Sequence, residues 1–287
     1  MNYINCNSNE FPVALKSLKP SLDGLYYAGD ISLLSKPIFA IVGSRDCSEY
    51  GISVAKKFAS ELSDIGITVI SGLAVGIDSY AHLASMKGDG KTIAVLPSGL
   101  TNVFPYENRG LFKDIIHNGG LVLSEYEPTF CANSNSFLKR NRIVSGLAMG
   151  TLVIEAEARS GTSVTAKYTV EQGNKLFCIP SNIDSKCGIG TNRMIQKGAK
   201  LVTCVNDILK EYEDFENTYV SNPAVSSPPP YYNEIYNFIG NGTKNVDDIF
   251  KYFKMNMSEI MYALTLLEMG NFIQQVPGNN YVQVRRI

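Results

Sequence analysis

The chain has 287 residues, of which 45% are hydrophobic and 18% charged, and its formal net charge is −1. These values are typical of a globular protein with a large core, and they exclude disorder, collagen and coiled coil as descriptions of the whole chain. A net charge near zero produces no field over the whole protein that would attract nucleic acid. Any site for a polyanion is therefore expected to be local.

The N-terminus and the residue counts exclude several further classes. The start, MNYINCNSNEF, has neither the basic nor the apolar region of a signal peptide, and no run reaches the roughly 18 apolar residues of a membrane helix. We expect a cytoplasmic protein with no membrane partner. Six dispersed cysteines without a Cys-x-x-Cys pair indicate reduced thiols. With only two histidines, His82 and His117, histidine-based metal centres and catalytic triads are nearly excluded. Neither a metal nor a cofactor is expected.

Short β-branched runs alternate with helical patterns over most of the chain. Their apolar character is continuous rather than alternating, which is typical of parallel strands buried on both faces. The predicted fold class is α/β, a Rossmann-like, doubly wound and mostly parallel sheet. The expected strands are IFAIVGSR (38–45), TVISG (68–72), KTIAVLPSG (91–99), LVLSE (121–125), TLVIEA (151–156), KLFCIPS (175–181) and AKLVTC (199–204). After the first, Ser48 is expected to cap a helix that ends before Gly66.

The composition divides the chain into four parts. We expect residues 1–36 to form a lead-in packed on the sheet, 37–216 the Rossmann-like domain, and 231–287 a small winged-helix-like domain. Between the last two, NTYVSNPAVSSPPP (217–230) has four prolines and no charge, which is typical of an extended linker. In the small domain, a third helix carries one apolar stripe and is followed by a hairpin; the stripe is Ile260, Ala263, Leu264 and Leu267. A generic small α+β domain is the alternative.

Several of the predicted strands end in turns rich in glycine. Ligands of doubly wound sheets bind beyond the carboxyl ends of the strands, where amides and helix N-termini point outward. Gly43-Ser44-Arg45 and Ser160-Gly161-Thr162 are two such turns with phosphate-binding character, although Arg159 beside the second is expected to pair with Glu155 or Glu157. Neither the dinucleotide fingerprint nor a P-loop is present, which disfavours NAD and P-loop chemistry.

Residues 128–150 form the most basic window of the chain. They contain Lys139, Arg140 and Arg142 and no acid, with Phe137 just before them. An aromatic ring beside cations suits single-stranded nucleic acid, whose bases stack and whose phosphates pair with Arg or Lys. A solvated loop with a core phenylalanine is the alternative. Asp78 and His82 are four residues apart like an acid–base pair, but without a nearby nucleophile a structural role is favoured.

Six ordered blocks resemble the DNA processing protein A family, also called DprA or Smf. They are GSRDCSEYG (43–51), SGLAVGIDSYAH (71–82), TIAVLPSGLTNVFPYEN (92–108), FLKRNRIVSGL (137–147), EARSGTSVTA (157–166) and GIGTNRMIQKGAKLV (188–202). The resemblance implies a homodimeric single-stranded DNA-binding protein of natural transformation and competence that is not an enzyme. It also implies that the protein protects incoming DNA and loads the RecA recombinase onto it.

The resemblance and the turns together define the expected nucleic-acid site. Phe137 is expected to stack on a base, and Arg45, Lys139 and Arg142 to neutralise phosphates. The full set is Gly43, Ser44, Arg45, Gly72, Phe137, Lys139, Arg140, Asn141, Arg142, Ser160, Gly161 and Thr162. The chain departs from the family pattern at Val75, where many relatives carry Lys, at Glu107 and at Ser181. The first two lower the local positive charge, so the protein is expected either to bind DNA more weakly or to depend more on stacking.

Two other functions are weighed against this one. The lysine-decarboxylase-like nucleotide phosphoribohydrolases use a Glu for hydrolysis, but Thr165 stands at that position here, and a hydroxyl cannot stabilise an oxocarbenium as a carboxylate does. A duplex-binding regulator needs donors on its recognition helix, yet SEIMYALTLLEMG (258–270) has no basic residue. The C-terminal domain is therefore expected to contact protein and not to bind duplex DNA tightly.

Overall fold

The computed structural model describes residues 2–158, 160–212, 232–240, 242–253, 255–269 and 272–283. The chain divides into two compact units, Met1–Phe215 and Glu216–Ile287. The predicted linker 217–230 lies outside the described residues, and the division of the chain into four parts stays a prediction.

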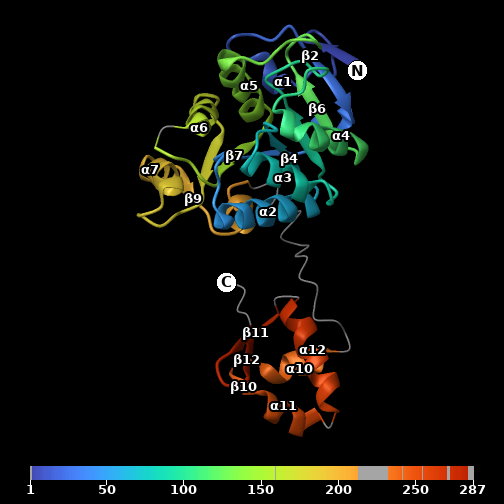
Figure 1. Cartoon of the computed structure of the whole chain (residues 1–287), viewed down its shortest axis with the longest axis vertical. Coiled ribbons are helices and arrows are strands. Elements are labelled where there is room, and N and C mark those ends of the chain that lie inside the picture. The colour runs from blue at the N-terminus through green and yellow to red at the C-terminus, as the bar shows by residue number, and fades with distance from the viewer. Residues whose placement is uncertain are drawn as a thin grey trace. The chain divides into compact units, whose positions relative to one another are not determined.

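The larger unit is built on one nine-stranded sheet with the order β1-β2-β6-β5-β4-β3-β7-β8-β9 (Figure 1). Neighbouring strands from β6 to β9 are parallel, whereas β1 and β2 pair antiparallel at one edge. All of the predicted runs contain a strand, which confirms the mostly parallel α/β fold. The bounds are β1 (Asn2–Asn5), β2 (Gly24–Gly29), β3 (Ile38–Val42), β4 (Thr68–Ser71), β5 (Thr92–Val95), β6 (Leu121–Ser124), β7 (Gly150–Val153), β8 (Lys175–Cys178) and β9 (Lys200–Leu201).

The strand order reverses at β3. From β3 the chain adds β4, β5 and β6 on one side and then returns to place β7 on the other side of β3. This reversal confirms the doubly wound topology. The loops that follow β3 and β7 leave in opposite directions, so a crevice opens beyond their carboxyl ends at this topological switch point.

Helices cover both faces of the sheet because successive strand residues point to opposite sides. Phe39 and Ile41 of β3 pack with one layer, while Ala40 and Val42 pack with the other. The first layer holds α2 (Glu49–Asp64), α3 (Ile77–Ser85), α4 (Arg109–His117) and α8 (Val205–Leu209). The second holds α1 (Val13–Lys16), α5 (Ser134–Leu147), α6 (Gly161–Glu171) and α7 (Ile189–Gln196). Short 3-10 turns lie at η1 (Ile31–Ser35), η2 (Tyr106–Asn108) and η3 (Lys186–Gly188).

Helix α2 has the ends that its sequence predicts. The Ser48 hydroxyl accepts a hydrogen bond from the Gly51 amide at 3.1 Å and so caps the first turn. The helix ends at Asp64, just before Gly66, whose φ of 83° lies in the left-handed region that favours glycine. Both predicted ends are confirmed.

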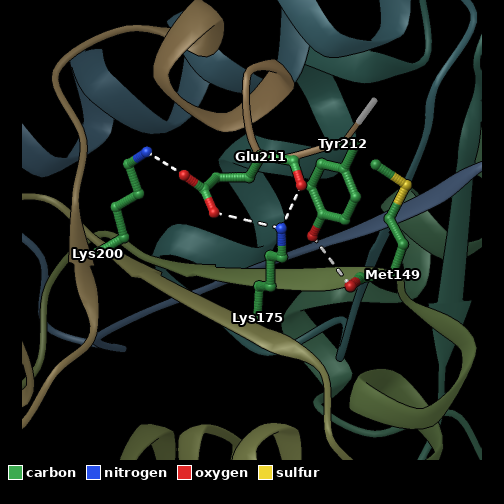
Figure 2. Close-up of polar contacts among 5 residues, drawn as sticks. All are labelled: Met149, Lys175, Lys200, Glu211 and Tyr212. Atoms are coloured by element: carbon green, nitrogen blue, oxygen red, sulfur yellow. Dashed lines mark hydrogen bonds and ion pairs between the residues drawn. The ribbon is translucent and has the colours of Figure 1, made fainter. Parts of the chain in front are cut away.

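The last described segment of the larger unit is tied to the sheet (Figure 2). The Glu211 carboxylate pairs with Lys175 of β8 at 3.2 Å and also with Lys200 of β9. Hydrogen bonds from these two lysines lower the pKa of Glu211. The Tyr212 hydroxyl donates to the carbonyl of Met149 at 3.0 Å. Together these contacts fix the segment after α8 against the strands at that end of the sheet.

The described residues of the smaller unit form three helices and a three-stranded antiparallel sheet of order β10-β12-β11. Its elements are α10 (Asn233–Ile239), β10 (Lys244–Asn245), α11 (Val246–Phe253), α12 (Met257–Met269), β11 (Ile273–Val276) and β12 (Asn280–Gln283). The predicted apolar stripe of α12 is fully buried in this unit's core, which confirms its orientation. The winged-helix assignment stays a prediction. No helix in the described part of either unit has the length and apolar character to cross a bilayer.

Candidate nucleic-acid interface

A cavity of about 370 Å³ lies at the switch point, beyond the carboxyl ends of β3 and β7. The loops after β3, β4 and β7 contribute to its walls, together with α5 and the start of α6. Most of the residues predicted for the site line this cavity: Gly43, Ser44, Arg45, Gly72, Phe137, Arg140, Asn141, Ser160, Gly161 and Thr162. Segments far apart in the sequence therefore meet here, because the carboxyl ends of parallel strands share one edge.

The start of α6 provides donors for an anion. The Ser160 hydroxyl is buried there and has no hydrogen-bond partner among the residues that the structure describes. The first turn carries no acidic side chain, so the helix dipole and the first amides are left to attract negative charge. Thr162 Oγ1 donates to the Gly43 carbonyl at 3.0 Å and holds the turn after β7 against the turn after β3.

The start of α2 is different, because the protein's own carboxylate occupies it. Glu155 is buried, and its two oxygens accept from the Ser48 amide at 3.0 Å and from the Ser48 hydroxyl at 2.5 Å. The sequence predicts that the Gly43–Arg45 turn presents an anion site in front of α2. Glu155 therefore supplies a negative charge at the start of α2, whereas the first turn of α6 carries no acidic side chain. The anion site at the Gly43–Arg45 turn stays a prediction. Arg159, the predicted partner of Glu155 or Glu157, lies outside the described residues.

Arg45 and Phe137 form a cation–aromatic pair at the cavity. The Arg45 guanidinium carbon lies 5.3 Å from the centroid of the Phe137 ring. Arg45 is exposed and Phe137 is partly buried. The loop after β3 and helix α5 thus place a permanent cation and a ring side by side, both lining the cavity.

Arg140 forms part of the cavity wall from a buried position. It is 5% exposed, and its guanidinium donates to the carbonyls of Gly72 and Val95 and to Asn141 Oδ1. Burial lowers the pKa of Arg140 to about 10, which leaves the side chain charged at neutral pH. A side chain at Gly72 would meet this guanidinium and displace it, so glycine there leaves Arg140 its place in the cavity wall.

The structure does not bring Lys139 and Arg142 to the cavity lining. Phe137, Arg140 and Asn141 share one face of α5 by their helical spacing, and Lys139 and Arg142 fall on other faces. Arg142 is 2% exposed and pairs with Glu125 at 2.5 Å, while Lys139 is exposed to solvent. Because its charge is already paired, we leave Arg142 out of the proposed phosphate contacts.

Carboxylates also line the cavity, and the sequence interpretation missed them. Asp46 and Glu157 are exposed at the turns after β3 and β7; Asp46 directly follows Arg45, and Glu157 lies three residues before Ser160. Asp78 is buried and accepts from the amides of Gly72 at 3.0 Å and Ala74 at 3.4 Å. Burial raises the pKa of Asp78, and the nearby Arg140 charge acts in the opposite direction. The cavity is therefore less positive than the sequence predicts.

Asp78 and His82 do not act as a pair. Asp78 accepts a hydrogen bond from the turn after β4, whereas His82 Nδ1 shares a 2.7 Å hydrogen bond with Thr92 Oγ1. Burial, with a smaller contribution from Arg140, lowers the pKa of His82 to about 3, so the ring is neutral. These contacts agree with the structural role favoured from the sequence.

The cavity wall contains Thr165, the residue at the position of the hydrolase glutamate, and its side chain is buried. Within the described part of the chain, no three His, Cys, Asp or Glu side chains are placed to hold a metal ion.

A doubly wound parallel sheet, with a cavity and a cation–aromatic pair at its switch point, defines a Rossmann-like protein. The profile of a family described as DNA recombination-mediator protein A matches residues 2–213. The chain belongs to this family, which confirms the resemblance seen in the six blocks.

Individual relatives agree with this assignment. DNA processing protein DprA of Streptococcus pneumoniae is 43% identical over 189 residues, which cover 66% of this chain and 66% of that protein. Protein Smf of Escherichia coli is 33% identical over 291 residues, covering 99% of this chain and 77% of that protein. A solved structure of DNA processing protein A from Helicobacter pylori, described for its single-stranded DNA binding mode, is 31% identical with a TM-score of 0.67. It covers 74% of this chain and 98% of that chain.

Proposed function

We propose that this protein binds single-stranded DNA in the switch-point cavity and breaks no bond there. The observation that carries the proposal is the joint placement, in one cavity, of the Arg45–Phe137 pair and the start of α6, where the Ser160 hydroxyl has no hydrogen-bond partner among the described residues. A single strand offers both a phosphate for the amides and an unpaired base for the ring. In a duplex the bases are stacked inside and cannot reach Phe137.

In the proposed mode a phosphate lies at the start of α6, and the Arg45 guanidinium neutralises it from the facing turn. The base of the same or the next nucleotide stacks at Phe137. Lys139, exposed two residues further along α5, adds a second positive charge for the backbone. Amides and rings do not distinguish bases, so binding is sequence-tolerant.

Fluorescence anisotropy with the full chain tests this proposal against its alternatives. Labelled oligothymidylate is the first ligand, and the matching duplex and AMP compete with it. The proposal expects displacement by unlabelled single strands and much weaker competition by duplex and AMP. Preferential competition by AMP, with release of adenine, would instead indicate a phosphoribohydrolase, and preferential competition by duplex would indicate a duplex-binding regulator.

The salt dependence of binding follows from the number of cations that reach phosphates. A single strand loses affinity with a log–log slope of about −0.7 per phosphate contact. With Arg45 and Lys139 as the contacts, we expect a slope near −1.4 per site, rather than the roughly −2 that a third contact from Arg142 would produce. Titrations of oligothymidylate over a range of KCl concentrations measure the slope. A slope unaffected by Arg45→Ala would contradict the assignment.

Neutralising a carboxylate at the cavity should tighten binding. Glu157 is exposed at the turn beside α6, where it repels an incoming phosphate. We expect Glu157→Gln to raise the affinity for oligothymidylate about two- to fivefold, the size typical of an exposed charge interaction. Glu171→Gln, at the far end of the same helix, is the matched control and should change nothing. Weaker binding by Glu157→Gln would mean that this carboxylate supports the site.

We further propose that the protein acts in the cytosol as a homodimer that shields incoming DNA during natural transformation and loads RecA onto it. Two cavities on one strand would multiply the affinity without new contacts. Light scattering that gave a single-chain mass would contradict the dimer.

For the smaller unit we propose protein contact, because the described face of α12 exposes Met261 and Tyr262 rather than cations.

A further inference from the structure

A row of aromatic rings leads away from the cavity. The Phe137 ring contacts the Phe104 ring with centroids 5.5 Å apart, and Phe104 contacts Tyr106 at 5.6 Å. Cations lie at both ends: Arg45 is 5.3 Å from the Phe137 centroid, and the Arg109 guanidinium carbon is 4.4 Å from the Tyr106 centroid. We call Phe137, Phe104 and Tyr106 the aromatic track. It connects the cavity to the start of α4.

The outer end of the track is open to solvent. Tyr106 is 58% exposed, and Arg109 is exposed as well. A tyrosine so far from the core contributes little to folding through burial. The neighbouring rings of the track meet edge to face, at interplanar angles of 81° and 65°, so the rings do not cover each other's faces as stacked rings would.

The loop that carries the track is held firmly. Asn108 is buried, and its amide group donates to the Leu73 carbonyl and to Ser79 Oγ, both at 2.9 Å. On the other side, the Thr101 amide donates to the Pro128 carbonyl at 2.9 Å. These contacts hold the backbone of the loop on both sides of Tyr106 before any ligand arrives, which lowers the entropy lost on binding.

The charges at the outer end are balanced rather than strongly positive. Arg109 is accompanied by Glu107, which is also exposed beside Tyr106. Phosphate attraction alone would make a weak site here, and an exposed ring with one adjacent guanidinium favours stacking of a base. A base stacked on Tyr106 would belong to a ligand that is long enough to fill the cavity and to extend beyond it.

We propose that the aromatic track is a second binding segment for the same single strand of nucleic acid. The inference rests on the proposed function: the strand leaves the cavity at Phe137, passes Phe104 and stacks a further base on Tyr106, with Arg109 at the adjoining phosphate. A mononucleotide or a very short oligonucleotide fills the cavity without reaching Tyr106. The track thus adds affinity only for longer strands.

Oligothymidylates of two lengths test the inference: a dinucleotide, which is too short to stack on Phe137 and still reach Tyr106, and a strand of about 16 nucleotides, the upper limit of the site sizes known for single-strand-binding folds. We expect Tyr106→Ala to leave the affinity for the short strand unchanged and to weaken binding of the long strand about fivefold or more. Tyr106→Phe should retain both affinities, and Arg109→Ala should weaken only the long strand. Tyr3→Ala, at an exposed tyrosine on the edge strand β1, is the matched control.

The outcomes separate this inference from the proposed function. One outcome is that the wild-type chain binds both strands while the Tyr106 and Arg109 variants bind the long strand as tightly as the wild type does. That result would overturn binding at the aromatic track and leave the proposed binding in the cavity intact. Equal losses for both lengths would also overturn it, because they would show that Tyr106 only supports the cavity wall. If the wild-type chain binds neither strand, the proposed function and the track fail together.

Discussion

Replacing Arg140 by methionine is expected to lower the free energy of unfolding of the larger unit by about 3–5 kcal/mol. The guanidinium is buried and donates to the carbonyls of Gly72 and Val95, which would lose their partner. The same change would leave the buried Asp78 carboxylate without the cation that offsets its desolvation. Urea unfolding of the full chain, followed by far-UV circular dichroism, measures the loss.

Lys139→Met is the matched control for this prediction, because it removes a cation from the same helix at an exposed position. It should change the free energy of unfolding by no more than about 0.5 kcal/mol. Adding Asp78→Asn to Arg140→Met should recover part of the loss, since the uncompensated charge is removed. An Arg140→Met protein as stable as the control would show that the guanidinium does not support the cavity wall.

Replacing Phe137 by alanine is expected to weaken binding of oligothymidylate by about 1–3 kcal/mol, or about 5- to 140-fold. The ring is the proposed stacking surface at the cavity, and it also holds the Arg45 guanidinium 5.3 Å from its centroid. Its loss therefore removes the stack and releases the cation that faces the phosphate. Anisotropy titrations at fixed salt measure the change.

Phe137→Tyr keeps the ring and should keep most of the affinity, whereas Phe137→Leu keeps apolar volume without a π face and should lose most of it. Thermal unfolding of each variant checks that the fold persists. If leucine binds as well as phenylalanine, Phe137 packs the wall rather than stacking on a base.

The sheet could be predicted from the sequence because buried parallel strands have continuous apolar runs, and each predicted run contains a strand. The two strands of the N-terminal segment were missed. NYIN and GLYYAG are short, polar or glycine-containing, and pair antiparallel at the edge, where burial on both faces is not required. The segment expected to pack on the sheet therefore extends the sheet itself.

The turns after β3, β4 and β7 could be predicted to meet, because the carboxyl ends of parallel strands lie at the same edge of the sheet. Which charged side chains near them are free of a partner within the protein could not be predicted. The helical phase of α5 decides that Arg140 faces the cavity and Arg142 does not, and that phase could have been read from the spacing. The partner of Arg142 is Glu125, on the loop after β6, and the Glu155 carboxylate that fills the start of α2 is 107 residues from Ser48. No local pattern in the sequence reports such distant pairings.

The most direct measurement of the central claim is photo-cross-linking of an oligothymidylate that carries a photoreactive uracil, with the attached peptide identified by mass spectrometry. The account predicts that the principal cross-link lies at Phe137 and disappears when unlabelled single strand, but not duplex, is added in excess. Cross-links confined to residues 232–283, with none at the switch-point cavity, would contradict it.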